Sequence, residues 1–317
     1  MPDGDRHRPA RSQRTLIGMP PSDEADTELA NVSRWVALER ERAQRAALVA
    51  QRHEGLSGST SESVRAHHNR MAATYRRVEQ RHLAAARLQA LHALRLRRWA
   101  HGPNQGALRP AFMAAVATML GMDSAIITLT GHDHAPGMVA ASDSTARAAH
   151  DLEFVLGEGP MADVDAFGEI IVVNDAIRCD RWPQYGAAVA ELGVRTVVAM
   201  PLALTTARLG TLCAFDSRPD HTGNGTSSAG QVAEALTQSV LLAPETDERS
   251  DGMPSLPLFI EADYHAVMHQ AVGMVSVQCD CTLADALAIL RARAFALGMP
   301  IDSVADAIVS GTTKLTP

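Results

Sequence analysis

Apolar and polar residues follow different periods in different parts of this 317-residue chain, and the changes of period predict its organisation. Residues 1–23 are rich in Pro, Arg, Ser and Asp and lack apolar periodicity, which predicts a disordered segment. Residues 24–101 are helix-forming with a ragged apolar stripe, which the Gly- and Ser-rich run 55–61 interrupts. We therefore expect two long helices, over 26–53 and 62–99.

Between residues 107 and 243 the pattern changes to short β-rich runs separated by helical stretches. A helical pattern that starts at Leu108 ends at Gly121, and the run TTAR predicts a hairpin turn between the last two strands. This order predicts an α+β domain with an antiparallel sheet flanked by helices. The expected strands are 124–130, 138–142, 170–173, 196–204 and 209–215, and the expected helices are 145–151, 161–167, 184–192 and 227–242.

A third region follows an acidic, proline-bearing linker over 244–257. Residues 258–312 have the pattern of three short helices around one small core. Thr282 and Asp285 resemble a capping box that opens the second helix, and Gly298 ends it. The expected helices are 261–279, one that opens at Thr282, and 301–310, with inward stripes of Tyr264, Met268, Ala271 and Val275, then Leu283, Leu287, Leu290, Ala294 and Leu297, then Val304, Ile308 and Gly311.

The first of these three helices has an unusual surface. Between Tyr264 and Cys279 it has no formally charged residue, whereas a surface helix normally has a charged outer face. Gly273 lies opposite the apolar stripe, at a cost of about 1 kcal/mol relative to alanine, and allows another backbone to approach closely. The helix therefore has either a core side and a partner side, or it is buried within its own domain.

Charge is divided unevenly along the chain. Residues 1–101 hold 18 arginines and 11 acidic residues, whereas the remainder holds 11 basic and 25 acidic residues. The expected helix 62–99 carries nine of these arginines and, after Glu62, the single acid Glu79. It is either an arm for nucleic acid or a dimerising or signalling helix whose arginines face water. We favour the second interpretation, because such charge runs are usually solvated.

Several classes of protein are disfavoured by the sequence. No apolar run approaches the ~18–20 residues that cross a bilayer, and the N-terminus has no apolar core, so we expect neither a membrane span nor a secretory signal. Four cysteines without framework spacing fit reduced thiols in the cytoplasm. We expect these cysteines, including Cys279 and Cys281, to be buried packing thiols, and His132 and His134 to be solvated. No nucleophile–base set, metal cluster or phosphate loop is recognisable, so we expect no enzymatic activity.

The sheet region contains five motifs in sequence order: LEFVLGEGP (152–160), GEIIVV (168–173), RWP (181–183), GVRTVVAMPL (193–202) and RLGTL (208–212). Together these motifs resemble the GAF domains of bacterial GAF–ANTAR regulators. The resemblance implies a sensor domain over 107–243 with an unidentified small-molecule ligand, and it names no cofactor.

The residues of this region suggest where such a ligand would lie. A sheet with one covered face is the usual setting for a pocket, and Met161, Trp182 and Tyr185 are the candidates that would line it. The run Gly157-Glu-Gly-Pro160 is either a tight turn or a phosphate-cradling loop. We favour the turn, because the spacing matches no phosphate fingerprint and Glu158 would repel an anion.

The third region resembles the ANTAR family in all three helices, through VMHQAVGMVSVQ (267–278), ALAILRARA (286–294) and VADAIV (304–309). The resemblance implies an RNA-binding domain over 258–312 that acts as a dimer on stem-loops in nascent transcripts, in transcription antitermination. The chain would then be a sensory regulator in signal transduction. The alternative is a protein-interaction and dimerisation module whose helical tail binds a protein partner.

The charge of this region limits how RNA would be recognised. Residues 255–317 hold six acids and three bases, a balance that is poor for general phosphate attraction. RNA would therefore be recognised by shape and by exposed loop bases. The candidate RNA-binding residues are His269, Gln270, Gly273, Ser276, Arg291, Arg293 and Lys314. Each of the two arginines is equally well explained as a solvated residue on the flank of its helix.

Overall fold

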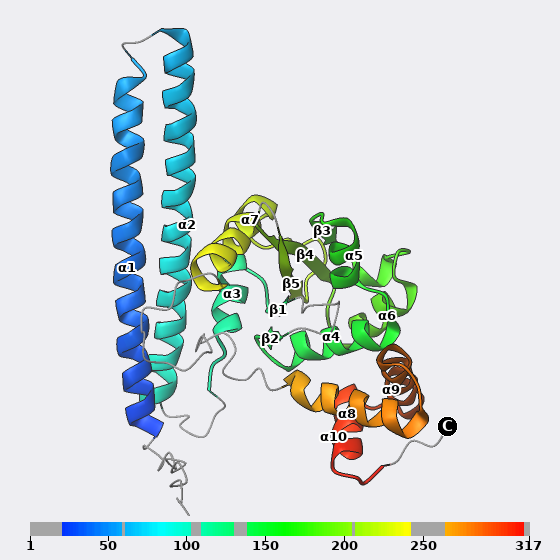
Figure 1. Cartoon of the computed structure of the whole chain (residues 1–317). Coiled ribbons are helices and arrows are strands. Elements are labelled where there is room, and N and C mark those ends of the chain that lie inside the picture. Colours follow the sequence, from blue (N-terminus) through cyan, green and yellow to red (C-terminus); the bar gives the residue numbers. More distant parts are fainter. Residues whose placement is uncertain are drawn as a thin grey trace, which may run out of the picture.

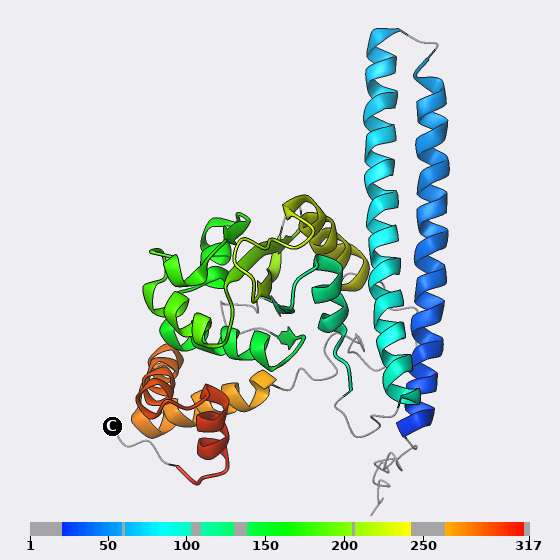
Figure 2. The ribbon, with the colours of Figure 1, turned by 180° about the vertical axis from the view of Figure 1, so that it is seen from behind.

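The computed structural model describes residues 21–58, 61–102, 109–129, 138–204, 207–241 and 264–313. These residues form a long helical hairpin, a sheet domain and a three-helix tail, with the sheet domain between the other two (Figures 1 and 2). The mixed α+β class with an antiparallel sheet is confirmed. The predicted linker 244–257 lies outside the described residues.

The hairpin consists of α1 (Pro21–Leu56) and α2 (Glu62–His101), which lie antiparallel and in contact along their length (Figure 1). Both expected helices are therefore present, and α1 begins inside the segment that was predicted to be disordered. Small side chains in the contact let the two helices approach closely. The buried alanines are Ala43, Ala46 and Ala50 on α1 and Ala72 and Ala86 on α2, whereas Ala84 and Ala85 of α2 join the core of the sheet domain.

The sheet has five antiparallel strands in the order β2-β1-β5-β4-β3. Successive residues of β5 point to opposite faces, so that Cys213 and Phe215 join one core cluster and Leu212 and Ala214 the other. Both faces are covered, which explains why the strands are almost continuously apolar. The strands are β1 (Ser124–Leu129), β2 (Val139–Ala141), β3 (Ile171–Val173), β4 (Thr196–Ala203) and β5 (Arg208–Asp216).

Helices cover the two faces of the sheet in separate layers (Figures 1 and 2). The first layer holds α3 (Phe112–Leu120), α7 (Thr226–Ala235) and the π-helical turn η3 (Leu236–Leu241), and α2 of the hairpin packs against it. The second layer holds α4 (Ser144–Leu156), α5 (Pro160–Phe167), the short η2 (Ala176–Arg178) and α6 (Pro183–Glu191).

The tail has its own core. It consists of α8 (Tyr264–Cys279), α9 (Leu283–Leu297) and α10 (Ile301–Val309). The Thr282 hydroxyl accepts a hydrogen bond from the Asp285 amide at 3.2 Å, and left-handed Gly298 ends α9, as the sequence predicts. The buried core side chains are Met268, Ala271, Val272, Val275, Ala286, Leu290, Ala294, Ile301, Val304, Ala305 and Ile308.

Three details differ from the sequence-based expectations. Helix α4 continues to Leu156 instead of ending at residue 151, because the apolar residues before Gly157 complete its inward stripe. Leu283 and Leu297, predicted to face the tail core, are 62% and 46% exposed, and they are the first and last residues of α9. Gly311 is likewise exposed instead of inward.

Candidate functional site

The run that follows α4 brings the ends of three helices together. Gly157 adopts the left-handed conformation, with φ of 72°, and its N–H bonds Glu153 O to end α4. Glu158 Oε1 accepts hydrogen bonds from the amides of Gln184 and Tyr185, at 2.7 and 2.9 Å, and so caps α6. Pro160 then opens α5. The run is therefore a structural turn, and its acid, Glu158, caps a helix of the same domain.

Glu153 is a buried polar residue of α4. It lies on the inward stripe of α4 with Ala146 and Ala149 and is only 5% exposed. Its Oε1 accepts a hydrogen bond from the Ala162 amide at 2.7 Å. A Cβ on Gly159 would come within 2.5 Å of the Glu153 side chain, so glycine is required there for the carboxyl to fit.

Burial sets the protonation of this carboxyl. Loss of solvent raises the pKa of Glu153 to about 8, although the amides of Ala162 and Met161 act in the opposite direction. At neutral pH the group is therefore mainly neutral and able to donate a proton. Its Oε2 is buried and has no hydrogen-bond partner among the described residues.

Two further buried groups lie in the same cluster as Glu153. The Tyr185 hydroxyl is also buried without a partner among the described residues. Burial raises the pKa of Tyr185 and that of Cys213, and a charge on Glu153 would raise both further. The Cys213 thiol is thus a buried neutral group, as expected, whereas Cys179 is only half-buried.

The three residues predicted to line a ligand pocket do gather beside Glu153. Met161, Trp182 and Tyr185 all belong to the core cluster on this face of the sheet, and the two aromatic rings meet edge to face with centroids 6.1 Å apart. They are 5%, 2% and 0% exposed, so they are packed against their neighbours instead of lining an open cavity. Their role in binding a ligand stays a prediction.

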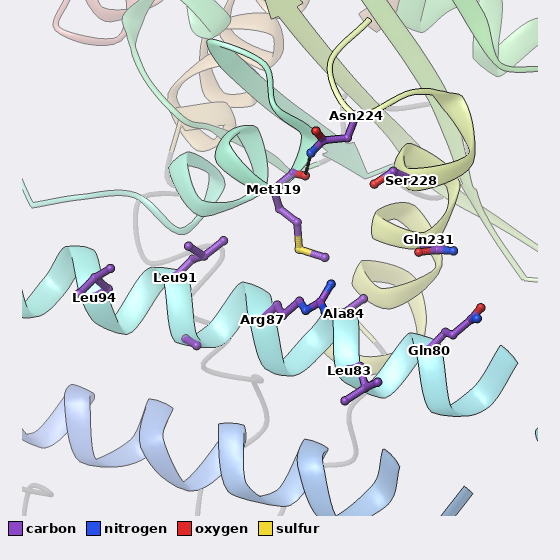
Figure 3. Close-up of a pocket in the computed structure, with 11 residues that line it drawn as sticks. Gln80, Leu83, Ala84, Arg87, Leu91, Leu94, Met119, Asn224, Ser228 and Gln231 are labelled. Carbon is purple, nitrogen blue, oxygen red and sulfur yellow. Dashed lines mark hydrogen bonds between the residues drawn. The ribbon is translucent and has the colours of Figure 1, made fainter. Parts of the chain in front are cut away.

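An open pocket lies on the other side of the sheet domain, between α2, α3 and α7 (Figure 3). Its volume is about 600 Å³, and on the side opposite α2 Asn224 donates a hydrogen bond to Met119 O at 2.8 Å. The predicted pocket residues do not line it. The lining side chains are Leu83, Ala84, Ala90, Leu91, Leu94 and Met119, with Gln80, Arg87, Asn224, Ser228 and Gln231.

The tail places some of the candidate RNA-binding residues on its surface. Gln270 and Arg293 are exposed. Gly273 is half-buried, and a Cβ there would meet nothing within 4 Å, so among the described residues no backbone approaches it. The side chain of His269 and all of Lys314 lie outside the described residues.

Two other candidates make contacts within the chain, and their role in RNA binding stays a prediction. The Ser276 hydroxyl donates to Cys281 O at 2.6 Å and holds the turn between α8 and α9. Arg291 is half-buried, and its guanidinium lies over the Phe154 ring of α4, 4.2 Å from the centroid. Burial lowers the pKa of Arg291.

Within the described ranges no group of three or more His, Cys, Asp and Glu side chains is placed to hold a metal ion. Cys279 and Cys281 are half-buried and pack at the edge of the tail core, and His132 and His134 lie outside the described ranges. No described helix combines the length and the apolar character that crossing a membrane requires.

Comparisons with known proteins address the sheet domain. The model of the GAF domain family matches residues 108–243. The chain is similar to a domain assigned to a two-component sensor histidine kinase of Sinorhizobium meliloti 1021, with 18% identity and a TM-score of 0.31 over 41% of this chain and 85% of that one. It is also similar to the GAF domain of the cyanobacteriochrome TePixJ, with 21% identity and a TM-score of 0.32 over 41% and 83%.

A third similar structure is the chromophore-binding domain of an unusual bacteriophytochrome from R. palustris, with 11% identity and a TM-score of 0.29 over 51% of this chain and 60% of that one. No curated protein matches the chain. The family match ends before the tail begins. Together with the antiparallel sheet between two helical layers, it identifies residues 108–243 as a GAF domain, a signal-sensing domain.

Proposed function

We propose that the chain is a sensory transcription regulator in which the tail is an ANTAR-type domain that binds RNA stem-loops in transcription antitermination. The observation that carries the proposal is the tail itself: three short helices with a separate core, in the segment whose three helices resemble that family. The GAF domain supplies the signal input. The proposal includes a dimer, as the resemblance implies.

The surface of the tail favours recognition of bases over attraction of phosphates. Residues 255–317 carry six acids and three bases. Of the two arginines described in the tail, Arg293 is exposed and Arg291 is half-buried. Gln270 is exposed on α8, and the open space at Gly273 leaves room for a nucleotide to approach that helix. Amide and guanidinium groups can hydrogen-bond the edges of unstacked loop bases.

The input side of the proposal rests on Glu153 and Tyr185. Glu153 Oε2 and the Tyr185 hydroxyl are buried without a hydrogen-bond partner among the described residues, which is costly unless something pairs with them. A small molecule with both a donor and an acceptor would satisfy the neutral carboxyl and the hydroxyl together. Because this cluster is packed, binding such a ligand requires the helices over it to shift, which is how a signal would leave the domain.

RNA binding can be tested with a library of hairpins whose loops are randomised. The full chain should enrich particular loop sequences, with a shallow dependence on salt that corresponds to about one or two phosphate contacts. Arg293→Ala should weaken the enriched hairpin about tenfold. Arg178→Ala, at an exposed arginine of the GAF domain, is the matched control and should leave the affinity unchanged.

Two outcomes would contradict the proposal. A steep salt dependence that Arg293→Ala leaves unaltered would assign binding to the nine arginines of α2, as sequence-independent attraction. Failure to bind any hairpin would remove the RNA function altogether.

A protein-interaction module is the second candidate function, and one observation favours it. The tail exposes several large apolar side chains, and such side chains, where they cluster, mark protein interfaces. They are Val277, Leu283, Phe295, Leu297 and Met299, which are 84%, 62%, 66%, 46% and 43% exposed. A chain that binds no hairpin but loses self-association or partner binding in Phe295→Ser would support this second function.

A further inference from the structure

The tail contacts the GAF domain at α4. Helix α9 lies against α4 in the structure, and both views show the tail beside that helix (Figures 1 and 2). Phe154 and Val155 of α4 pack against the tail core, and Arg291 of α9 lies over the Phe154 ring. The tail and the GAF domain thus meet in an apolar contact that also includes one cation, the Arg291 guanidinium.

This contact partly buries Arg291 without pairing it with an acid among the described residues. No carboxylate among the described residues lies within ion-pair distance of its guanidinium, and its Nε is buried without a hydrogen-bond partner there. A cation over an aromatic ring is a weak attraction compared with the loss of water around a guanidinium. The contact is therefore easily reversed, unlike a buried ion pair.

The same helix also faces the sensor core. Glu153 and Phe154 are neighbours in the sequence, yet Glu153 points into the buried polar cluster whereas Phe154 points to the tail. Since α4 is a single helix of 13 residues, a shift or rotation caused at Glu153 must move Phe154 as well. The site proposed for input and the surface that holds the tail are thus mechanically joined.

We propose that α4 is a reversible docking surface for the tail, and that the docked chain is a closed state in which Phe154 withholds Arg291 from RNA until a change at Glu153 moves α4. The proposal rests on the proposed RNA-binding function, because it names how that function is regulated. Docking itself is a property of the folded chain and is measured without RNA.

Hydrogen exchange of the full chain tests docking. Phe154→Ala removes the ring, and Phe154→Leu keeps apolar bulk but removes the aromatic face, so that one variant remains informative if the other fails to fold. In both, amide exchange in α9 should rise several-fold. The matched control is Phe167→Ala, which removes an Arg–Phe contact of similar kind, with Arg181 5.2 Å from the ring centroid, at a site remote from the tail. It should leave α9 unchanged.

Affinity for the enriched hairpin tests the regulation. If docking withholds Arg291, both Phe154 variants should bind about three- to tenfold more tightly than the wild type and Phe167→Ala. Unchanged exchange in α9 would overturn the docking surface. Increased exchange with unchanged or weaker RNA binding would overturn the closed state as a regulator. If no variant binds any hairpin, the proposed function and its regulation both fail, while the exchange data still decide whether α4 docks the tail.

Discussion

Replacing Glu153 with glutamine should make the GAF domain more stable at neutral and alkaline pH. The carboxyl is almost completely buried, and burial raises its pKa from an ordinary 4.5 to about 8. Glutamine has nearly the same shape and never ionises. Its side-chain oxygen can still accept the hydrogen bond that the Ala162 amide donates.

The magnitude follows from the two pKa values. Below pH 4.5 the carboxyl is protonated in both the folded and the unfolded chain, so the variant and the wild type should differ little. Between pH 4.5 and about 8 the unfolded chain releases the proton and the folded chain keeps it. The free energy of unfolding therefore falls as pH rises, by ~1.4 kcal/mol per pH unit. Glu153→Gln should gain roughly 3 kcal/mol over the wild type at pH 7.

Urea unfolding at several pH values measures this difference. Trp182 lies in the same buried cluster, so a background with Trp35→Phe and Trp99→Phe leaves a fluorescence reporter for this domain. Glu169→Gln, at an exposed carboxylate of the same domain, is the matched control and should not reproduce the effect. Parallel stability curves for Glu153→Gln and the wild type from pH 4.5 to 8 would refute the reasoning.

Three other variants test the local structure. Gly159→Ala places a Cβ 2.5 Å from the Glu153 side chain and should lower the free energy of unfolding by roughly 2 kcal/mol, measured in urea. An unchanged urea midpoint would show that the turn accommodates the Cβ without a clash. Thr282→Ala removes the cap of α9 and should cost about 1 kcal/mol, seen as faster amide exchange in its first turn. Leu290→Ala should cost about 2–5 kcal/mol and unprotect α8 to α10 while the sheet stays protected; equal protection in the tail would contradict the assigned core.

Most of the fold follows from local patterns in the sequence. The β-rich runs occur where the strands lie, within one or two residues, because both faces of the sheet are buried and select apolar, β-branched residues. Gly121 and Gly298 end helices in the left-handed conformation that few other residues adopt. Errors occur at element ends, as at Leu283 and Leu297, where a periodic pattern continues although the side chain is exposed.

The candidate sites were less predictable. Arg291 was recognised as a functional candidate, but its contact with Phe154 joins segments more than a hundred residues apart, and no local pattern reports such a pair. Glu153 was missed although a signal was present. It continues the spacing of Ala146 and Ala149 on the inward stripe of α4, and an acid at such a position is expected to be buried.

The most direct test of the proposed function is to locate the RNA on the protein. Ultraviolet crosslinking of the enriched hairpin to the full chain, followed by peptide mass spectrometry, identifies the contacting segment. We expect crosslinks within residues 264–313, in peptides that contain Gln270 or Arg293, and more of them in Phe154→Ala than in the wild type. Crosslinks confined to α2, or equal and sparse labelling of the whole chain, would contradict an RNA-binding tail.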